Sequence, residues 1–259
     1  MNIVIIGAGR VATHLSVALQ LAGACVVQVF SRTLVSAANL AEKLCVPYTD
    51  NIKNVVCDAD MYLVAVSDDA LSDVAKTLVP GREKALFVHT AGSVPMSIWH
   101  EAGADHYGIL YPLQTFSKDK KVELSLVSFF VEASDEKSLQ RIESVAHRLT
   151  SHVYRADSER RSALHVAAVF ACNFSNAMYC MAEELLKKAD LPFEGLLPLI
   201  DETAAKVHVL NPVDAQTGPA VRGDDEVMAQ HRKMLADHAE WQRLYERISK
   251  VIQEYHDKL

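Results

Sequence analysis

Short apolar runs and amphipathic segments alternate through about the first 155 residues of the chain. The runs are nearly continuous in Val, Ile, Leu and Phe, which is typical of parallel strands covered on both faces. They lie at residues 3–6, 25–30, 61–66, 85–89, 106–110 and 127–131, with a further short strand expected near Val46. Helical patterns between and after them include residues 11–19, 70–78 and 136–149. This alternation predicts an α/β fold with a doubly wound parallel sheet.

The pattern changes at about Ala156, and no convincing strand follows. Asp157 and Ser158 are expected to cap a helix that runs through residues 163–188. Further helices are expected from Pro192, over residues 225–236 and over residues 240–257, with a turn-rich stretch at residues 211–224. The sequence therefore predicts an α/β domain at residues 1–156 and an all-α domain at residues 157–259.

The first apolar strand runs directly into a Gly-x-Gly-x-x-Ala turn at residues 7–12. In a Rossmann fold the first glycine allows the tight turn, the second lets the backbone approach a pyrophosphate, and the small third residue lets the helix pack closely. The amino end of that helix points N–H groups and a positive dipole at the phosphates. Because the motif follows a strand and precedes a helix, it predicts a Rossmann dinucleotide site rather than a glycine turn without a ligand. The residues expected to bind the cofactor here are Gly7, Ala8, Gly9, Arg10 and Val11.

The end of the second strand predicts which dinucleotide binds. An NAD enzyme carries Asp or Glu about 20 residues beyond the glycines, whereas this chain has Ser31, Arg32 and Thr33 and no acid between Gly9 and Glu42. A guanidinium pairs with a 2′-phosphate, which a carboxylate would repel, and the two hydroxyls can donate to the same phosphate. NADP(H) is therefore the expected cofactor. The alternative is an arginine that is merely solvated.

Loops after the later strands would reach the ribose and nicotinamide, because ligands bind beyond the carboxyl ends of the strands in open α/β sheets. The residues expected there are Val66, Ser67, Thr90 and Ser93. Asp68 and Asp69 are interpreted as caps of the following helix. His89 ends an apolar strand, and it is either a site residue or a core histidine.

Two further segments supply candidate substrate contacts. Tyr111 and Gln114 leave the sixth strand, so we expect them to line a substrate pocket, whereas Phe116 is expected to pack. In the turn-rich stretch, Arg222 can clamp a substrate carboxylate or phosphate. Asp224 is interpreted as the cap of the next helix.

The long helix of the second domain carries the catalytic candidates. His165 shares a face with Asn176 at helical spacing, and Asn173 lies about 80° from His165 around an ideal helix. Such polar groups on an apolar helix need partners, which a substrate cleft would supply. His165 is expected to give or take the proton of a hydride transfer, with Asn173 orienting the substrate. The alternatives are a polar helix–helix network and a dimer interface.

Composition narrows the class of protein. The chain has 26 basic and 33 acidic residues and a net charge of −7, with no long basic run, so nucleic-acid and membrane partners are not expected. No apolar stretch approaches the ~20 residues of a membrane span. The first strand also starts too early for a signal peptide. The five cysteines form no C-x-x-C pair and lie in apolar segments, which predicts buried reduced thiols, no metal site and a cytoplasmic protein.

Six motifs occur in an order that is found in one family of oxidoreductases. They are residues 7–12, 31–33, 66–68, 89–93, 111–116 and 218–224. The chain resembles Rossmann-like NADP oxidoreductases with a helical C-terminal domain of unknown function, over essentially its full length. More distantly it is similar to pyrroline-5-carboxylate reductase, to deazaflavin-dependent NADP reductases and to the 6-phosphogluconate dehydrogenase superfamily. The resemblance implies NADP binding in the first domain and a homodimer formed through the helical domain.

Two departures limit what the resemblance implies about mechanism. Hydroxyacid dehydrogenases of that superfamily place a catalytic Lys on the interdomain helix, but residues 160–186 contain no Lys. Prephenate dehydrogenases carry a His-Pro pair where this chain has Tyr111 and Pro112. Neither mechanism is therefore carried over.

The sequence predicts an NADP(H)-dependent oxidoreductase that transfers a hydride to or from a small carbonyl or imine substrate in a cleft between the domains. The alternative is a non-enzymatic dimeric protein that senses NADPH. Electron transfer to a second cofactor such as a deazaflavin is a third reading, for which the sequence has no separate signature.

Overall fold

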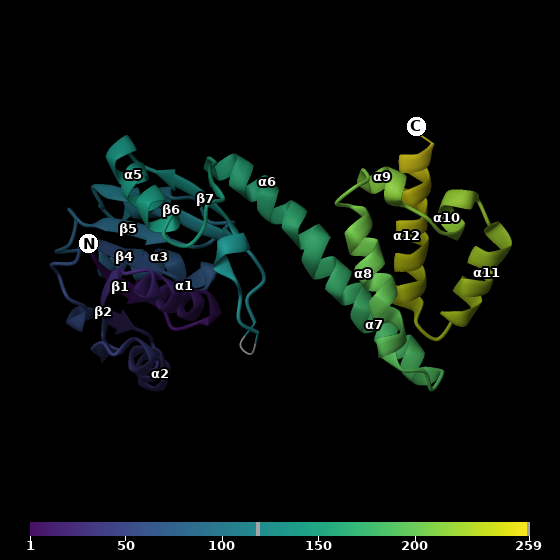
Figure 1. Ribbon diagram of the computed structural model, residues 1–259, viewed down its shortest axis with the longest axis horizontal. Coiled ribbons are helices and arrows are strands. Elements are labelled where there is room, and N and C mark those ends of the chain that lie inside the picture. Colours follow the sequence, from purple (N-terminus) through teal and green to yellow (C-terminus); the bar gives the residue numbers. More distant parts are fainter. Residues whose placement is uncertain (118–119, 258–259) are drawn as a thin grey trace. The chain divides into compact units, whose positions relative to one another are not determined.

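The computed structural model describes residues 1–117 and 120–257, and its first part contains an eight-stranded sheet (Figure 1). The strands are β1 (Asn2–Ile6), β2 (Cys25–Phe30), β3 (Tyr48–Thr49), β4 (Met61–Val64), β5 (Leu86–His89), β6 (His106–Leu113), β7 (Ser128–Ala133) and β8 (Val153–Arg155). Their order is β3-β2-β1-β4-β5-β6-β7-β8. Because β1 lies between β2 and β4, the strand order reverses beside it, and such a switch point places a ligand site at the carboxyl end of β1.

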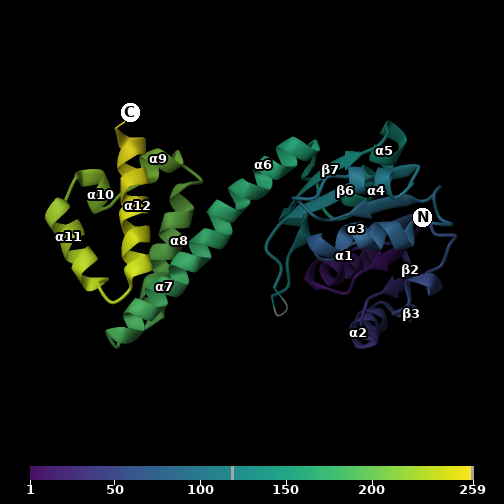
Figure 2. The same cartoon turned by 180° about the vertical axis from the view of Figure 1, so that it is seen from behind.

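Helices cover both faces of this sheet (Figure 2). One face carries α1 (Arg10–Leu21), α2 (Leu34–Leu44) and α5 (Glu136–Ala146), and the other carries α3 (Asp68–Leu78) and α4 (Ser97–Glu101). The side chains of a strand alternate between the two faces. Ile5 accordingly belongs to the core with Leu15 of α1, whereas Val4 belongs to the core with Leu71 of α3. Both faces of the central strands are thus buried, as the continuous apolar runs predict, and the doubly wound α/β fold is confirmed.

The last strands depart from the expectation of parallel pairing. β7 pairs with β6 in the antiparallel direction, and β8, which the apolar pattern does not predict, pairs with β7 in parallel. A short apolar run indicates burial but carries no signal for strand direction, which explains the error at β7. In β8 only Val153 is partly buried, while Tyr154 and Arg155 are exposed, so the strand lacks the apolar pattern that marks the others.

The expectation of buried cysteines is wrong. All five cysteines are exposed, at Cys25, Cys45, Cys57, Cys172 and Cys180. The apolar segments around Cys25, Cys45 and Cys57 do contribute to the core, but these three positions fall at a strand start, a helix end and a loop. Cys172 and Cys180 lie in the π-helical segment Val169–Phe174 and the helix Ser175–Lys188, neither of which has a buried residue. Alternation within an element, rather than the polarity of the segment, decides burial at such positions.

Helices make up the rest of the described chain, in which no strand follows Arg155. They are α6 (Ser158–Ala168), a π-helical segment (Val169–Phe174), α7 (Ser175–Lys188), α8 (Leu197–Lys206), α9 (Pro212–Ala215), α10 (Pro219–Arg222), α11 (Asp225–Met234) and α12 (Ala239–His256). Short 3₁₀ turns occur at Ile52–Asn54, Leu124–Leu126 and Phe193–Leu196. Of the two residues predicted to cap the long helix, Asp157 is confirmed as the N-cap, because its carboxylate accepts a 2.8 Å hydrogen bond from the Arg160 amide, whereas Ser158 is the first residue of the helix.

The chain divides into two compact units, residues 1–177 and the residues from 178 onward, and the division falls within α7. The predicted domain boundary at residues 156 and 157 falls between β8 and α6, and it stays a prediction. Within the described residues, no helix is long and apolar enough to cross a membrane.

Candidate functional site

The turn after β1 is built for close approach of its backbone. Gly7 has a φ of +113°, and a Cβ atom there would lie 2.3 Å from the carbonyl oxygen of Ala65, so only glycine fits. Gly9 follows as the N-cap of α1 and supplies no side-chain cap. The first-turn N–H groups of α1, including those of Arg10 and Val11, are therefore available to an anion. This geometry fits the pyrophosphate of a dinucleotide.

A groove of about 210 Å³ extends from this turn across the carboxyl ends of β1, β2 and β4. Its walls include Gly7, Ala8 and Gly9 from the turn, Ser31 and Arg32 after β2, and Val66 and Ser67 after β4. The groove thus brings together most of the residues that the sequence predicts for the cofactor. Among the described residues, Arg32 is exposed and makes no ion pair.

Two predicted cofactor residues lie at the edge of this groove. Thr33 is the N-cap of α2, and its hydroxyl donates a 2.7 Å hydrogen bond to Ser36 rather than capping the helix. The amino end of α2 therefore has no side-chain cap either. Arg10 lies on the other side of the glycine turn, where it lines a wider hollow of about 640 Å³ together with His14 and Lys43. Both positions add donors or positive charge around the bound phosphates that we expect.

The loops after β4 and β5 are joined by a side-chain contact. The Ser93 hydroxyl donates a hydrogen bond to the Asp68 carboxylate, and both side chains are exposed. The interpretation of Asp68 and Asp69 as helix caps is wrong, because Ser67 is the N-cap of α3 and the two acids lie in its first turn. Their charges there still complement the helix dipole. Thr90, also predicted near the nicotinamide, directly follows β5 and is partly buried.

Tyr111 and His165 are brought together from elements far apart in the sequence. The Tyr111 hydroxyl lies 3.1 Å from Nδ1 of His165, which belongs to α6. Tyr111 is buried, and this burial, reinforced by the negative charge of Asp68, raises the pKa of its hydroxyl above the ordinary value. Tyr111 is therefore protonated at neutral pH, and its hydroxyl lies beside the imidazole of His165. The two groups can exchange a proton.

His89 belongs to the core rather than to the site. It is fully buried, and its Nδ1 accepts a 3.2 Å hydrogen bond from the amide of Ala91. Burial first, and then the positive charge of Arg161, lower the pKa of His89 to about 3, so the ring is neutral at physiological pH. Of the two readings that the sequence left open, the structure favours the core histidine.

Among the described residues of the first unit, Asn173 and Gln114 form no hydrogen bond with the Tyr111–His165 pair. Asn173 is exposed and lies in the π-helical segment. A π-helix has more residues per turn than an α-helix, so the angle of about 80° between Asn173 and His165 that an ideal α-helix predicts does not apply. Gln114 is exposed, and its side chain accepts a 2.8 Å hydrogen bond from the Thr115 amide. Arg222 pairs with Asp224 at 2.8 Å in the helical unit. Asp224 does stand at the N-cap position of α11, but it makes no side-chain cap bond. The roles of Asn173, Gln114 and Arg222 stay predictions.

Sequence reasoning missed a charged pair beside the site. Arg161 is only 1% exposed, and its guanidinium forms an ion pair with Glu132 of β7. The spacing of Arg161 from His165 could have revealed its place beside the site, because residues four positions apart lie on the same face of a helix. Its partner Glu132 lies 29 residues away in a strand, and no spacing rule predicts that contact.

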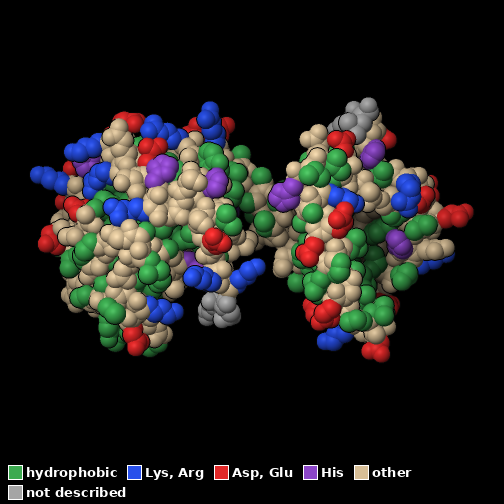
Figure 3. Space-filling view, in the orientation of Figure 1, with side chains coloured by type: hydrophobic (Ala, Val, Ile, Leu, Met, Phe, Trp, Pro, Cys, Tyr) green, Lys and Arg blue, Asp and Glu red, His purple; other side chains and the backbone are tan. Residues whose placement is uncertain are grey.

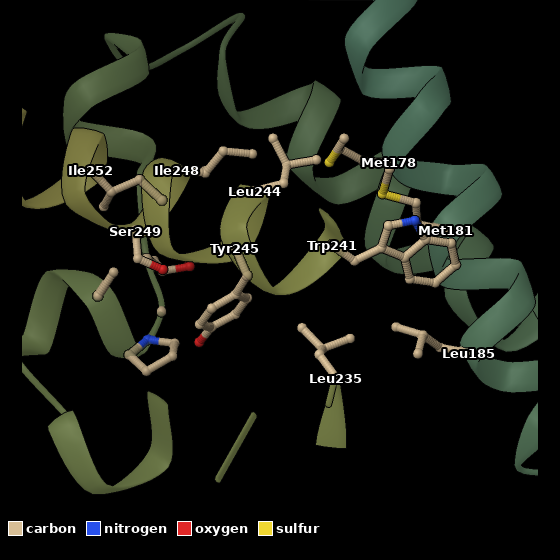
Figure 4. A pocket seen from close by; sticks show the side chains of 14 residues that line it. Met178, Met181, Leu185, Leu235, Trp241, Leu244, Tyr245, Ile248, Ser249 and Ile252 are labelled. Atoms are coloured by element: carbon tan, nitrogen blue, oxygen red, sulfur yellow. The ribbon is translucent and has the colours of Figure 1, made fainter. Parts of the chain in front are cut away.

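The helical unit contains a separate apolar pocket of about 300 Å³ between α7, α10 and α12 (Figure 4). Trp241, Leu244 and Tyr245 of α12 and Met178 and Met181 of α7 line it. The Tyr245 hydroxyl also lies 2.9 Å from Nδ1 of His231. The pocket is lined mainly by apolar side chains.

Comparisons with known proteins place the chain in a family. A model described as a Rossmann-like domain matches residues 1–117, and a domain of unknown function, DUF2520, matches residues 127–252. A protein from Bacteroides fragilis, described provisionally as an NADP oxidoreductase, has a structure that is 50% identical in sequence. The match covers 98% of each chain with a TM-score of 0.92. The chain belongs to this Rossmann–DUF2520 family.

Other solved structures share the fold of the Rossmann–DUF2520 chain at lower identity. An imine reductase from Myxococcus stipitatus, in complex with NADP⁺, is 16% identical over 98% of this chain and 93% of its own, with a TM-score of 0.72. A pyrroline-5-carboxylate reductase from Coxiella burnetii is 15% identical over 99% of this chain and 97% of its own, with a TM-score of 0.61. A search of curated proteins gave no match. The family resemblance inferred from the sequence motifs is confirmed.

Proposed function

We propose that this Rossmann–DUF2520 protein is an NADP(H)-dependent oxidoreductase that transfers a hydride to or from a small imine or carbonyl substrate. The observation that carries the proposal is the convergence of three features at the carboxyl ends of the sheet strands. These are the glycine turn after β1, Arg32 after β2 and the Tyr111–His165 pair at β6. The description of the Bacteroides fragilis relative supports the NADP oxidoreductase class.

The donors around the groove fit NADP(H). The uncapped amino end of α1 holds the pyrophosphate, while Arg32, Ser31 and Thr33 hold the 2′-phosphate. Once bound, NADPH supplies the hydride. Val66 and Ser67 line the groove beside the turn, and Thr90 and Ser93 follow the neighbouring strand toward the nicotinamide end.

The Tyr111–His165 pair supplies the proton that accompanies the hydride. The Tyr111 hydroxyl, kept protonated by its surroundings, donates to the substrate oxygen or nitrogen, and His165 returns a proton to Tyr111 across the 3.1 Å contact. His165 is half-buried and can in turn exchange a proton with solvent. In the oxidation direction the same pair accepts the proton.

The charges around the pair favour an imine over a carbonyl. Two charged groups act on Tyr111, namely Arg161 and Asp68. Arg161 forms an ion pair with Glu132, whereas the Asp68 carboxylate has no cationic partner among the described residues. The Asp68 carboxylate would stabilise the cation that forms when the Tyr111 hydroxyl protonates an imine nitrogen, and this protonated imine accepts hydride more readily than the neutral imine. The fold similarity to imine and pyrroline-5-carboxylate reductases supports the same class.

A matched pair of substrates tests this proposal. NADPH oxidation is followed by absorbance with a cyclic imine and with the ketone of the same ring size. We expect turnover with the imine to exceed turnover with the ketone, and Asp68→Asn to lower the imine rate more than the ketone rate. Binding of NADPH without oxidation by either compound would instead support the alternative of an NADPH sensor.

The helical unit is proposed to form a homodimer. No residue of α7, α8 or α12 is buried, and in the described part of this unit the buried residues are Ala220, Met228 and Leu235. Figure 3 shows hydrophobic side chains gathered on its surface. So small a core does not stabilise a unit of this size alone, whereas a second copy would bury the exposed apolar side chains.

A further inference from the structure

Arg161 is buried at a position where every nitrogen of its guanidinium is bonded. Nε donates a 3.1 Å hydrogen bond to the carbonyl of Gly92, and Nη2 donates a 2.9 Å bond to the carbonyl of Val94. Nη1 pairs with the carboxylate of Glu132, and Nη2 also reaches the Ser158 hydroxyl at 3.3 Å. These contacts tie α6 to the loop after β5 and to strand β7 at one point.

Gly92 connects this arginine to the Tyr111–His165 pair. A Cβ atom built on Gly92 would lie 2.7 Å from Cζ of Tyr111 and 2.9 Å from Nδ1 of His165. Both rings therefore pack directly on Gly92, while the carbonyl of the same residue is bonded by Arg161. The place of Gly92 thus determines how closely the two rings can approach each other.

We propose that Arg161 is a positioning residue for the proton-transferring pair, because it fixes Gly92 under both rings and holds α6 so that His165 meets the Tyr111 hydroxyl. The proposal rests on the proposed function for the role of the pair, although its geometry stands independently. Arg161 and His165 are four residues apart, so one face of one helix carries both the anchor and the imidazole.

The chemistry of arginine suits this task better than that of lysine. A guanidinium presents donors in several fixed directions, and here it uses them on two backbone carbonyls, a carboxylate and a hydroxyl. A lysine at this position keeps the charge for Glu132 but cannot reach both Gly92 and Val94. The positive charge of Arg161 also lowers the pKa of Tyr111, opposing the effect of burial and of Asp68.

Arg82 provides a matched control within the same unit. Arg82 is also buried, at 8% exposure, and it bonds the backbone carbonyls of Val55, Val56 and Leu78. These contacts precede β4 and β5, so they lie toward the amino ends of the strands, at the edge opposite the site. Arg82→Lys therefore removes a comparable backbone anchor without touching the pair.

The experiment compares Arg161→Lys with Arg82→Lys by NMR of ¹⁵N-labelled histidine, with the His165 signal assigned from His165→Gln. We expect Arg161→Lys to move the His165 Nδ1 signal toward that of a free imidazole, and Arg82→Lys to leave it unchanged, although both lower the thermal midpoint. With a turned-over substrate, Arg161→Lys lowers kcat about 10- to 100-fold at nearly constant KM. If Arg161→Lys does not fold, Glu132→Gln, which removes the carboxylate and keeps the arginine, replaces it with the same expected direction.

An unchanged His165 signal in a folded Arg161→Lys or Glu132→Gln variant would overturn the proposal, and so would an equal shift in Arg82→Lys. NADPH titration of the same samples separates this outcome from a failure of the proposed function. If the wild-type protein binds no NADPH, the function proposal fails, but the NMR comparison still decides whether Arg161 positions the pair.

Discussion

The Tyr111 hydroxyl lies 3.1 Å from Nδ1 of His165, although 54 residues separate the two in the chain. Tyr111 lies two residues before the end of β6, and His165 belongs to a helix that starts after the last strand of the sheet. Their contact places a protonated phenol beside an imidazole at the edge where the cofactor groove also opens. The proposed chemistry depends on this contact.

Replacing Tyr111 by Phe removes the hydroxyl and keeps the ring over Gly92. Because the hydroxyl is the proposed proton donor, we expect turnover to fall by a factor of about 10² to 10⁴, with little change in NADPH affinity. Tyr107→Phe in the same strand is the control, since the Tyr107 hydroxyl has no part in the pair. Equal turnover in Tyr111→Phe and the wild type would exclude the pair as the proton source.

Gly9→Ala tests the approach of the cofactor without disturbing the fold. The backbone at Gly9 has a φ of −78°, and a Cβ atom there meets no heavy atom within 4 Å. The thermal midpoint of the free protein should therefore stay constant or rise slightly. NADPH affinity should fall at least about tenfold, because the methyl group occupies the space into which the pyrophosphate moves. Gly195→Ala, which is equally unhindered, should change neither property.

His89 makes stability depend on pH in acid. Its pKa is about 3 in the folded protein against 6.5 for a free histidine, so the unfolded chain binds more protons between these values. The contribution of His89 to the free energy of unfolding is therefore complete above pH 6.5. It is lost as the pH falls from 6.5 toward 3, by up to about 1.4 kcal/mol per pH unit. Urea unfolding across this range should show a shallower slope for His89→Asn, which keeps an acceptor for the Ala91 amide. Parallel slopes in the two proteins would contradict this account of His89.

Charges introduced on the helical unit test the homodimer. Leu199 of α8 and Val251 of α12 are 62% and 49% exposed, and a second copy would cover them. Sedimentation should show a dimer for the wild type and a shift toward monomer for the double variant Leu199→Glu, Val251→Glu. Leu21→Glu, at an 82% exposed site on α1, should leave the dimer intact. A monomeric wild-type protein at micromolar concentration would rule the dimer out.

Local patterns predicted the fold well, and they named most of the residues that line the groove after β1, because these signals are local. The strand, glycine turn and helix of residues 3–19 are contiguous, and Ser31 to Thr33 follow a strand whose place beside β1 is fixed by the fold. Contacts between segments that are distant in the sequence were harder to predict. The sequence named Tyr111 and His165 separately, but it could not show that they touch.

Arg161 and Glu132 were missed for the same reason. Charged residues in the first turn of a helix, such as Arg161, or near the edge of a sheet, such as Glu132, are ordinarily exposed to solvent. Only the tertiary structure shows that Arg161 is buried and that Glu132 pairs with it. The composition of a segment also does not predict the direction in which a strand pairs, as the antiparallel β7 shows. Nor does it predict whether a single side chain faces the core or the solvent, as the exposed cysteines show.

A fluorescence titration with NADPH and NADH side by side, on the wild type and on Arg32→Ser, tests the proposed function most directly. We expect the wild type to bind NADPH at micromolar concentration and NADH much more weakly. Arg32→Ser should lose about 10- to 100-fold in NADPH affinity, as expected for hydrogen bonds to a charged group, and should leave NADH binding nearly unchanged. Lys76→Ala, on the exposed end of α3, should behave as the wild type. Failure of the wild-type protein to bind either dinucleotide would contradict the cofactor assignment and the oxidoreductase proposal with it.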